Sequence, residues 1–331
     1  MITLPMHNAR VLVTNPGSSV IRLVYDLIEQ GVQVTVETAE PDRTLADVVS
    51  RQLISVVTKA DASAYDLVLR DSGEWHRPCG IQRDCGRVTL VGGGPGPSGL
   101  LTRAGFDAIA RADVIVCDRL VPLGCLSAAR TDAEIVYVGK MPHGEFTPQE
   151  TINATLVEYA LRDKHVVRLK GGDGFVFGRG GEEWIACKVN GIDVEVIPGV
   201  TSSVAVPALA GIPLTHRGMT QGFVVVSGHV EPDDPRSEVN WAAIAHSGLT
   251  VVVLMGVATV GAITAALITH GMADDTPAAA ISDGGLPSMR LVSSTVTGLA
   301  DGIAVAELRA PAVLVIGPVV HALQSSPGDN L

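Results

Sequence analysis

Two glycine-rich segments, each directly after a short apolar run, constrain this chain more than any other feature. Residues 91–98 read Val-Gly-Gly-Gly-Pro-Gly-Pro-Ser, and residues 168–183 interleave glycines with two aromatic and several charged side chains. Glycine at this density lets the backbone approach a ligand closely. The interleaved charges favour a ligand site over two tight turns without a ligand. Two such turns at strand ends predict one small-molecule site built from both.

The composition predicts a large, folded α/β protein. Of 331 residues, 47% are hydrophobic and only 18% are charged, which is typical of a compact soluble enzyme. Short Val-rich runs separated by helical stretches predict parallel sheets that are buried on both faces. The net charge of −11 argues against a nucleic-acid surface. An anionic substrate would therefore need a local cluster of basic residues.

Five cysteines without a C-x-x-C pair indicate a reducing cytoplasm and argue against disulfides or a metal site. The N-terminus has no basic region followed by an apolar stretch, so no signal peptide is expected. Two uncharged stretches, 196–215 and 250–271, are interrupted by prolines and by Gly256 respectively. We therefore expect them to be buried core and expect no membrane contact.

Residues 1–86 are predicted to form a small Rossmann-like α/β segment and a linker. Strands are expected at 10–14, 33–37, 53–58 and 66–70, with a helix over 20–30 and a linker over 71–86. Glu37 stands where a ribose-binding acid would lie in a dinucleotide-binding unit. Only Gly17 remains of the three-glycine phosphate loop, so a fold without its ligand is favoured.

Two further α/β domains are predicted, 87–215 and 216–322, with the active site in the cleft between them and a flexible tail at 323–331. Expected strands in the first are 87–91, 113–117, 134–138, 165–169 and 193–197, with helices at 98–111, 148–162, 181–190 and 202–210. Thr147-Pro-Gln-Glu150 has the form of a capping box. Expected elements in the second are strands 223–227, 251–255, 278–282, 291–297 and 312–316 and a helix over 258–270.

The cofactor has two competing interpretations. Residues 94–99 form a G-x-G-x-x-G pattern, and Asp118 follows nineteen residues later, which is typical of an NAD-dependent oxidoreductase. Against this, Pro95 and Pro97 lack the N–H donors that a pyrophosphate requires. Asp173 in the second glycine segment suits a cation, and a sulfonium cofactor fits both observations.

From residue 88 to about 320 the chain resembles the uroporphyrinogen-III C-methyltransferases of the tetrapyrrole methylase superfamily. The matching motifs include Val-Gly-Gly-Gly-Pro-Gly at 91–96, Cys-Asp-Arg-Leu-Val at 117–121, Val-Gly-Lys at 138–140, Val-Val-Arg-Leu-Lys-Gly-Gly-Asp at 166–173, Phe-Gly-Arg-Gly-Gly-Glu-Glu at 177–183 and Pro-Gly-Val-Thr-Ser at 198–202. The resemblance implies the tetrapyrrole methylase fold, S-adenosylmethionine (SAM) as methyl donor and a homodimer. It also implies methylation of uroporphyrinogen III at C2 and C7, through precorrin-1 to precorrin-2, for sirohaem or cobalamin synthesis.

The resemblance also implies site residues. Asp118 would be the proton acceptor and Lys140 the proton donor. The implied cofactor contacts are Pro95, Gly171, Gly172, Asp173, Val176, Thr201, Ser202, Met255 and Gly284. The substrate carries eight carboxylates, and basic residues within or beside the motifs would bind them: Arg119, Arg168, Lys170, Arg179 and Arg217, with His216 as a further candidate.

Several positions depart from the family pattern. Pro97 and Gly174 replace a usual Asp and Pro, Cys117 replaces a Tyr, Met141 replaces an Arg, and Gly284-Gly285 replaces a Gly-Thr pair. These changes bear on affinity and turnover more than on reaction class, and they leave a non-catalytic SAM- or tetrapyrrole-binding protein as an alternative. A later methylase of the cobalamin route is a second alternative, although the Val-Gly-Lys and Phe-Gly-Arg-Gly-Gly-Glu-Glu motifs favour the first interpretation. The first unit resembles a shortened precorrin-2 dehydrogenase domain of sirohaem synthases, and we expect it to bind no NAD.

Overall fold

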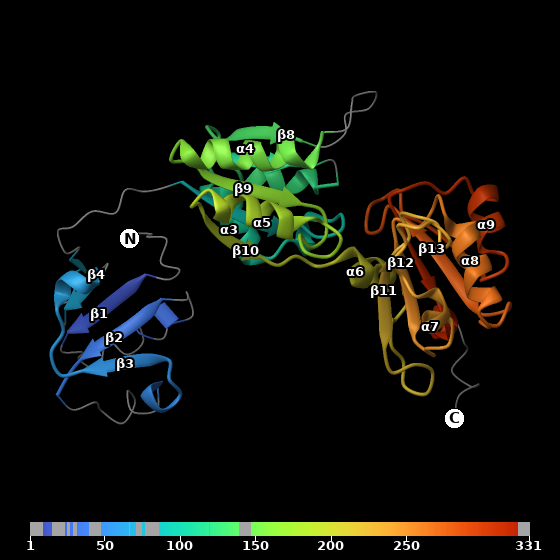
Figure 1. Ribbon diagram of the computed structural model, residues 1–331, viewed down its shortest axis with the longest axis horizontal. Helices are drawn as coiled ribbons and strands as arrows, with labels where there is room; N and C mark the ends of the chain where they lie inside the picture. Colours follow the sequence, from blue (N-terminus) through green and yellow to red (C-terminus); the bar gives the residue numbers. More distant parts are fainter. Residues whose placement is uncertain are drawn as a thin grey trace. The chain divides into compact units, whose positions relative to one another are not determined.

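The computed structural model describes residues 9–14, 24, 27–28, 32–39, 48–65, 67–70, 75–76, 86–118, 120–138 and 147–323. The chain divides into two compact units, Met1–Arg83 and Asp84–Leu331. The first contains one five-stranded sheet and the second contains two (Figure 1).

The sheet of the first unit has the order β3-β2-β1-β4-β5. Its strands are β1 (Arg10–Thr14), β2 (Gln33–Glu37), β3 (Ile54–Val57), β4 (Leu67–Arg70) and β5 (Trp75–His76). The short 3-10 helix η1 (Ala62–Ala64) lies between β3 and β4 along the chain. The first four strands pair in parallel and β5 is antiparallel. The segment 15–19, which contains Gly17, and most of the predicted helix over 20–30 lie outside the described residues. The linker predicted over 71–86 is partly wrong, because it contains β5, which pairs with β4; residues 71–74 and 77–85 lie outside the described residues.

The Glu37 carboxylate accepts a hydrogen bond from the Ala60 backbone N–H at 3.1 Å. It therefore ties the end of β2 to the segment after β3, which is a structural role that needs no ribose.

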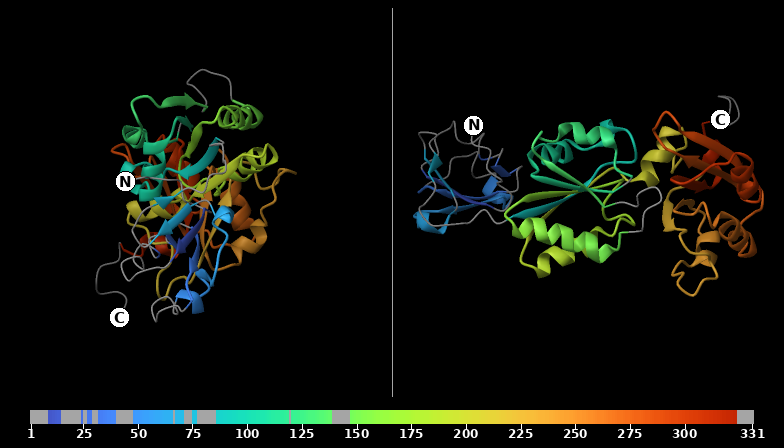
Figure 2. Two further views of the ribbon diagram at one scale, coloured as in Figure 1. Left: turned by 90° about the vertical axis from the view of Figure 1, so that its left-hand side faces the viewer. Right: turned by 90° about the horizontal axis from the view of Figure 1, so that it is seen from above.

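The next sheet is wholly parallel, with the order β10-β6-β9-β7-β8. Its strands are β6 (Arg87–Gly92), β7 (Val114–Cys117), β8 (Glu134–Tyr137), β9 (His165–Lys170) and β10 (Asp193–Ile197). On one face pack α3 (Arg103–Arg111) and the 3-10 helix η3 (Leu123–Ala128), and on the other α4 (Gln149–Leu161) and α5 (Gly180–Val189) (Figure 2). The connections lie on one face while the chain runs from β6 through β7 to β8, and on the other face when it returns to β9 and β10. This is expected if every crossover has the same hand.

Two helix starts differ from the sequence prediction. The helix predicted over 98–111 is split into the 3-10 turn η2 (Ser98–Leu100) and α3, because Thr102 is extended and accepts the Gly105 N–H at 3.1 Å. The predicted capping box is wrong: α4 begins at Gln149, and its N-cap, Pro148, has no side-chain acceptor. The N–H groups of Thr151 and Ile152 bond to the Pro148 carbonyl instead.

The last sheet is mixed, with the order β11-β12-β15-β13-β14. Its strands are β11 (Phe223–Ser227), β12 (Thr250–Leu254), β13 (Pro277–Ser282), β14 (Arg290–Thr295) and β15 (Ala312–Ile316). Only β11 and β12 pair in parallel. The prediction of parallel sheets is therefore only partly right here, because apolar runs report burial on both faces and not strand direction.

Helices cover both faces of this mixed sheet. Helices α7 (Trp241–Ala245), α8 (Val260–Thr269) and α9 (Leu299–Val305) pack on one core, while α6 (Ser202–Leu209) and the 3-10 helix η4 (Pro318–His321) contribute Val206 and Val320 to the other. Within the described ranges no helix has the length and apolarity needed to cross a membrane. The predicted tail is outside the described residues from position 324 onward.

Candidate functional site

The parallel sheet brings the predicted motifs to one edge. Strand register pairs Gly92 with Lys170 and Cys117 with Leu169, so the segments that follow β6, β9 and β7 leave the sheet side by side. On the other flank of β6, Val91 pairs with Ile197, which places the 198–202 segment next to the first glycine turn. Ligands of open α/β sheets bind at this carboxyl edge. The two glycine segments therefore meet at one edge of the sheet, while the small-molecule site predicted there stays a prediction.

Three glycines at this edge form a backbone-to-backbone contact that admits no side chain. A Cβ on Gly199 would lie 2.2 Å from the Gly172 carbonyl oxygen, and one on Gly92 would lie 2.5 Å from the Gly199 nitrogen. Gly94 and Gly172, both with positive φ, exchange N–H···O bonds of 3.1 and 2.7 Å. We refer to Gly92, Gly94, Gly172 and Gly199 as the glycine cradle. It leaves peptide groups, and no side chains, at the surface of these turns.

Asp173 holds two parts of this edge together. One carboxylate oxygen accepts the Phe175 N–H at 2.8 Å and the other accepts the Gly199 N–H at 2.9 Å. The carboxylate thus fixes the second glycine segment to the segment after β10 and also leaves a negative charge beside the cradle. Thr201 caps the following helix α6, and Ser202 lies near Gly172.

The segment that follows β6 of the parallel sheet packs against the segment that follows β13 of the mixed sheet, and the contact is made by glycine and proline. A Cβ on Gly96 would lie 2.8 Å from the Gly284 carbonyl oxygen, and one on Gly285 would lie 2.7 Å from the Pro97 ring. Val176 packs against the core of the mixed sheet. Met255 follows β12 with a φ of 59° and an exposed side chain. The predicted cofactor residues therefore come from both α/β parts of this unit.

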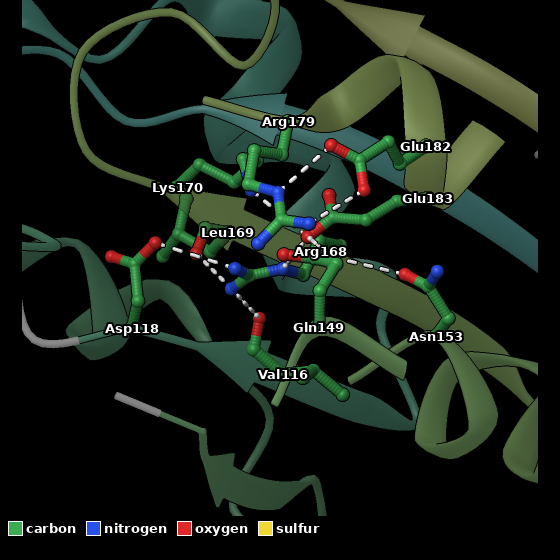
Figure 3. A network of polar contacts seen from close by, with 10 residues as sticks. All are labelled: Val116, Asp118, Gln149, Asn153, Arg168, Leu169, Lys170, Arg179, Glu182 and Glu183. Atoms are coloured by element: carbon green, nitrogen blue, oxygen red, sulfur yellow. Dashed lines mark hydrogen bonds and ion pairs between the residues drawn. The ribbon is translucent and has the colours of Figure 1, made fainter. Parts of the chain in front are cut away.

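Asp118 follows β7 at the same edge, and a buried charged network lies behind it (Figure 3). Its Oδ2 accepts a hydrogen bond from Arg168 at 3.3 Å. Arg168 and Lys170, both on β9, each donate to Glu183 Oε1 at 2.9 Å, and the Gln149 amide donates to the same oxygen at 3.3 Å. Exposed fractions are 3% for Arg168, 5% for Lys170 and 0% for Glu183, against 29% for Asp118. The network therefore runs from a buried helix position to a partly open carboxylate.

Burial lowers the pKa of Lys170, and the neighbouring Arg168 cation lowers it further, while Glu183 opposes both effects.

Burial, and secondly the charge of Asp118, raise the pKa of Cys117 to about 11, so this thiol stays protonated at neutral pH. The three described cysteines, Cys117, Cys125 and Cys187, are free and buried.

Glu183 is the site residue that the sequence interpretation missed. It lies inside the matched Phe-Gly-Arg-Gly-Gly-Glu-Glu motif, so the signal was present, but nothing in the spacing distinguishes it from the exposed Glu182. Arg179 is paired with Glu182 at 2.7 Å and is half exposed, and Arg217 is exposed. Arg119 and Lys140, together with Met141, lie outside the described residues. Arg168 and Lys170, which were predicted to bind substrate carboxylates, have their charges committed to Glu183.

Metal ligands do not gather anywhere in the described ranges: no group of three or more His, Cys, Asp or Glu side chains there could hold an ion. The first unit has a hollow lined by residues that include Arg10, Gln33 and Tyr65. Arg10 and Gln33 are the first residues of their strands, so this hollow lies at the amino edge, opposite to where such sheets bind ligands.

Comparison with known proteins agrees with this geometry. Residues 87–300 match the family model of the tetrapyrrole (corrin/porphyrin) methylases. A sirohaem synthase of Neisseria meningitidis serogroup B is 47% identical over 71% of this chain and 48% of its own length. The uroporphyrinogen-III C-methyltransferase of Priestia megaterium is 42% identical over 71% of this chain and 99% of its own length.

Among solved structures, the uroporphyrin-III C-methyl transferase from Thermus thermophilus, in complex with S-adenyl homocysteine, is 38% identical with a TM-score of 0.61. This similarity covers 72% of this chain and 94% of that one. The chain spans about half the length of the sirohaem synthases that it matches. Motifs, fold and comparisons together place it in one group: the chain belongs to the tetrapyrrole methylase family.

Proposed function

We propose that this chain is a SAM-dependent uroporphyrinogen-III C-methyltransferase, which methylates C2 and C7 and gives precorrin-2 by way of precorrin-1. The observation that carries the proposal is the glycine cradle beside Asp118, inside a region that resembles methyltransferases of this specificity. The relative from Priestia megaterium is covered over almost its entire length, so the similarity includes a whole enzyme of this kind.

The residues at the cradle fit a compact cationic donor. A Cβ has no room at Gly92 and Gly199, and Gly172 has a left-handed φ of 66°, so no side chains cover the peptide N–H and C=O groups of these turns. Asp173 supplies one negative charge close by. We propose that SAM is held by Pro95, Gly171, Gly172, Asp173, Val176, Thr201, Ser202, Met255 and Gly284. When bound, SAM supplies an electrophilic methyl group on a sulfonium.

The chain's own contribution is to orient the acceptor carbon and to move protons. Holding both reactants in one cleft removes an entropic barrier to their reaction. Methylation at a ring carbon is followed by loss of a proton, and Asp118, at the open edge of the sheet, is proposed to accept it. Lys140 is proposed as the proton donor.

The substrate's carboxylates require exposed cations. Arg217 meets this requirement, Arg179 is exposed but is paired with Glu182, and Arg119 remains a candidate. Direct contacts from Arg168 and Lys170 stay a prediction, which their burial and pairing do not favour. We further propose a cytoplasmic homodimer that contacts neither nucleic acid nor membrane. The first unit is proposed to have no NAD-dependent activity, consistent with the internal bond of Glu37.

Anaerobic incubation of the full chain with SAM and uroporphyrinogen III, read by mass spectrometry, tests the proposal. Two added methyl groups on the tetrapyrrole are expected. Unmodified substrate together with tight S-adenosylhomocysteine binding would indicate a non-catalytic binding protein. Transfer only to a later, already methylated precorrin would assign the chain to another step. Binding of NAD by the methyltransferase part would favour the oxidoreductase interpretation.

A further inference from the structure

We propose that Glu183 is a positioning residue for methyl transfer, which acts through Arg168 to hold the Asp118 carboxylate at the edge of the sheet. This inference rests on the proposed function and deepens it. Glu183 itself is fully buried on α5, so it is not proposed as a catalytic residue.

The geometry of Arg168 connects the two carboxylates. Its Nε donates to Glu183 at 2.9 Å and one terminal nitrogen donates to Asp118 at 3.3 Å. The other terminal nitrogen donates to the carbonyls of Val116 and Leu169 at 3.3 and 3.2 Å. All three nitrogens of the planar guanidinium are thereby engaged, and its orientation is fixed from several sides (Figure 3). Arg168 is therefore a bridge between α5 and Asp118, with four of its five N–H donors used within the protein.

Glu183 anchors this bridge with a single oxygen. Its Oε1 accepts from Arg168, Lys170 and Gln149, which come from two different elements. Two anions and two cations balance the charge of the network, in which Arg168, Lys170 and Glu183 are buried and Asp118 is partly exposed. Buried ion pairs add little net stability compared with apolar packing, so a role in geometry accounts for this arrangement better than one in stability.

Asp118 depends on the bridge for its orientation. Among the described residues, Arg168 is its hydrogen-bond partner through Oδ2, and Oδ1 is buried without a partner. The bond from Arg168 to Oδ2 is therefore the described side-chain contact that orients this carboxylate. If Arg168 shifts, the carboxylate shifts with it, and a misplacement of about 1 Å lowers a reaction rate by about a hundredfold.

The test is a double-mutant cycle between Glu183→Gln and Asp118→Asn, with kcat, the KM for SAM and calorimetric binding of S-adenosylhomocysteine measured for each chain. Glu183→Gln is expected to lower kcat about tenfold or more while the affinity for S-adenosylhomocysteine stays within about twofold. Asp118→Asn is expected to lower kcat by about a hundredfold or more. The double variant should match Asp118→Asn alone, because Glu183 acts only through Asp118.

Two results would overturn the inference: losses of kcat that multiply in the double variant, or a Glu183→Gln chain with unchanged kcat. If Glu183→Gln does not fold, Arg168→Lys takes its place in the cycle, since it keeps the buried cation but cannot bridge both carboxylates. Glu158→Gln on α4, which removes an exposed carboxylate paired with Arg162, is the matched control and should behave as wild type. Failure of the wild-type chain to methylate uroporphyrinogen III would instead refute the proposed function.

Discussion

Replacement of Gly199 by alanine tests whether the glycine cradle requires direct backbone contact. The new Cβ would lie 2.2 Å from the Gly172 carbonyl oxygen and 2.6 Å from the carbonyl carbon and Cα of Gly92. Carbon–oxygen contacts are normally about 3.3 Å or longer, so the two segments must separate by about 1 Å. Both neighbours are backbone atoms of tightly bonded turns, and no flexible side chain can move away instead.

Moving the two segments apart stretches the hydrogen bonds between them, and this lowers the free energy of unfolding. The Gly199 N–H donates to Asp173 at 2.9 Å, and an N–H···O bond lengthened by 1 Å is lost. Loss of one charge-assisted bond costs about 1.5–3 kcal/mol, and strain in the Gly94–Gly172 pair adds to this. We expect a free energy of unfolding lower by about 2–4 kcal/mol and an S-adenosylhomocysteine affinity about a hundredfold weaker.

Calorimetric unfolding and titration with S-adenosylhomocysteine measure the two effects separately. Gly261→Ala is the matched control, because no heavy atom lies within 4 Å of a Cβ at that position on α8. Alanine there should be neutral or stabilise the helix by up to about 1 kcal/mol. A Gly199→Ala chain with the stability and ligand affinity of wild type would refute the reasoning that the cradle excludes side chains.

Three other changes have expected outcomes. Gly285→Ala should destabilise the chain by about 1–3 kcal/mol, because φ is 78° and the Cβ would lie 2.7 Å from the Pro97 ring. Adding Pro97→Ala should recover part of this loss in urea unfolding, and strictly additive losses would contradict the contact. Gly174→Pro should raise the melting temperature by an amount equivalent to about 0.4–1 kcal/mol, since the Gly174 N–H donates to no described residue and φ is not left-handed; a lower melting temperature would argue against it. Burial lowers the pKa of His165 to about 4, so the folded chain favours the neutral ring, and stability present above about pH 6.5 should fall by at most about 3 kcal/mol as the pH drops towards 4. His165→Asn should flatten that dependence in a pH series of urea unfolding, and an unchanged slope would exclude this origin.

The strands were predictable because each apolar run records burial in a sheet. The runs at 10–14, 33–37, 193–197, 223–227 and 312–316 have the bounds that the pattern predicts. Helix starts were less predictable, since they depend on individual backbone bonds. Thr102, in the middle of an apparently continuous helix, accepts a hydrogen bond from the Gly105 N–H and is the N-cap of α3. Pro148 ends up as an N-cap without an acceptor, although the sequence around it has the form of a capping box.

The candidate site was likewise predictable only in part. Glycine density and interleaved charge identified the segments that meet at the sheet edge. The direction of each charged side chain was not recoverable from the pattern, because neighbouring positions of one motif can lie on opposite sides of the backbone. Glu182 is exposed and Glu183 fully buried, although they are consecutive and identical in type. Arg168 and Lys170 alternate with apolar residues on β9 and face the buried carboxylate together.

The sequence by itself determined most of the strands, the two glycine-rich segments that meet at the sheet edge, and the family, but not α7, α9 or β5. Those properties are local, since they follow from the residue type at each position and from the hydrophobic period. Only the tertiary structure decided that β9 lies between β6 and β7, and hence that Asp118, Arg168 and Glu183 share one network. Contacts between residues 50 positions apart depend on sheet order, which is set by packing of the whole unit and leaves no mark at a single position.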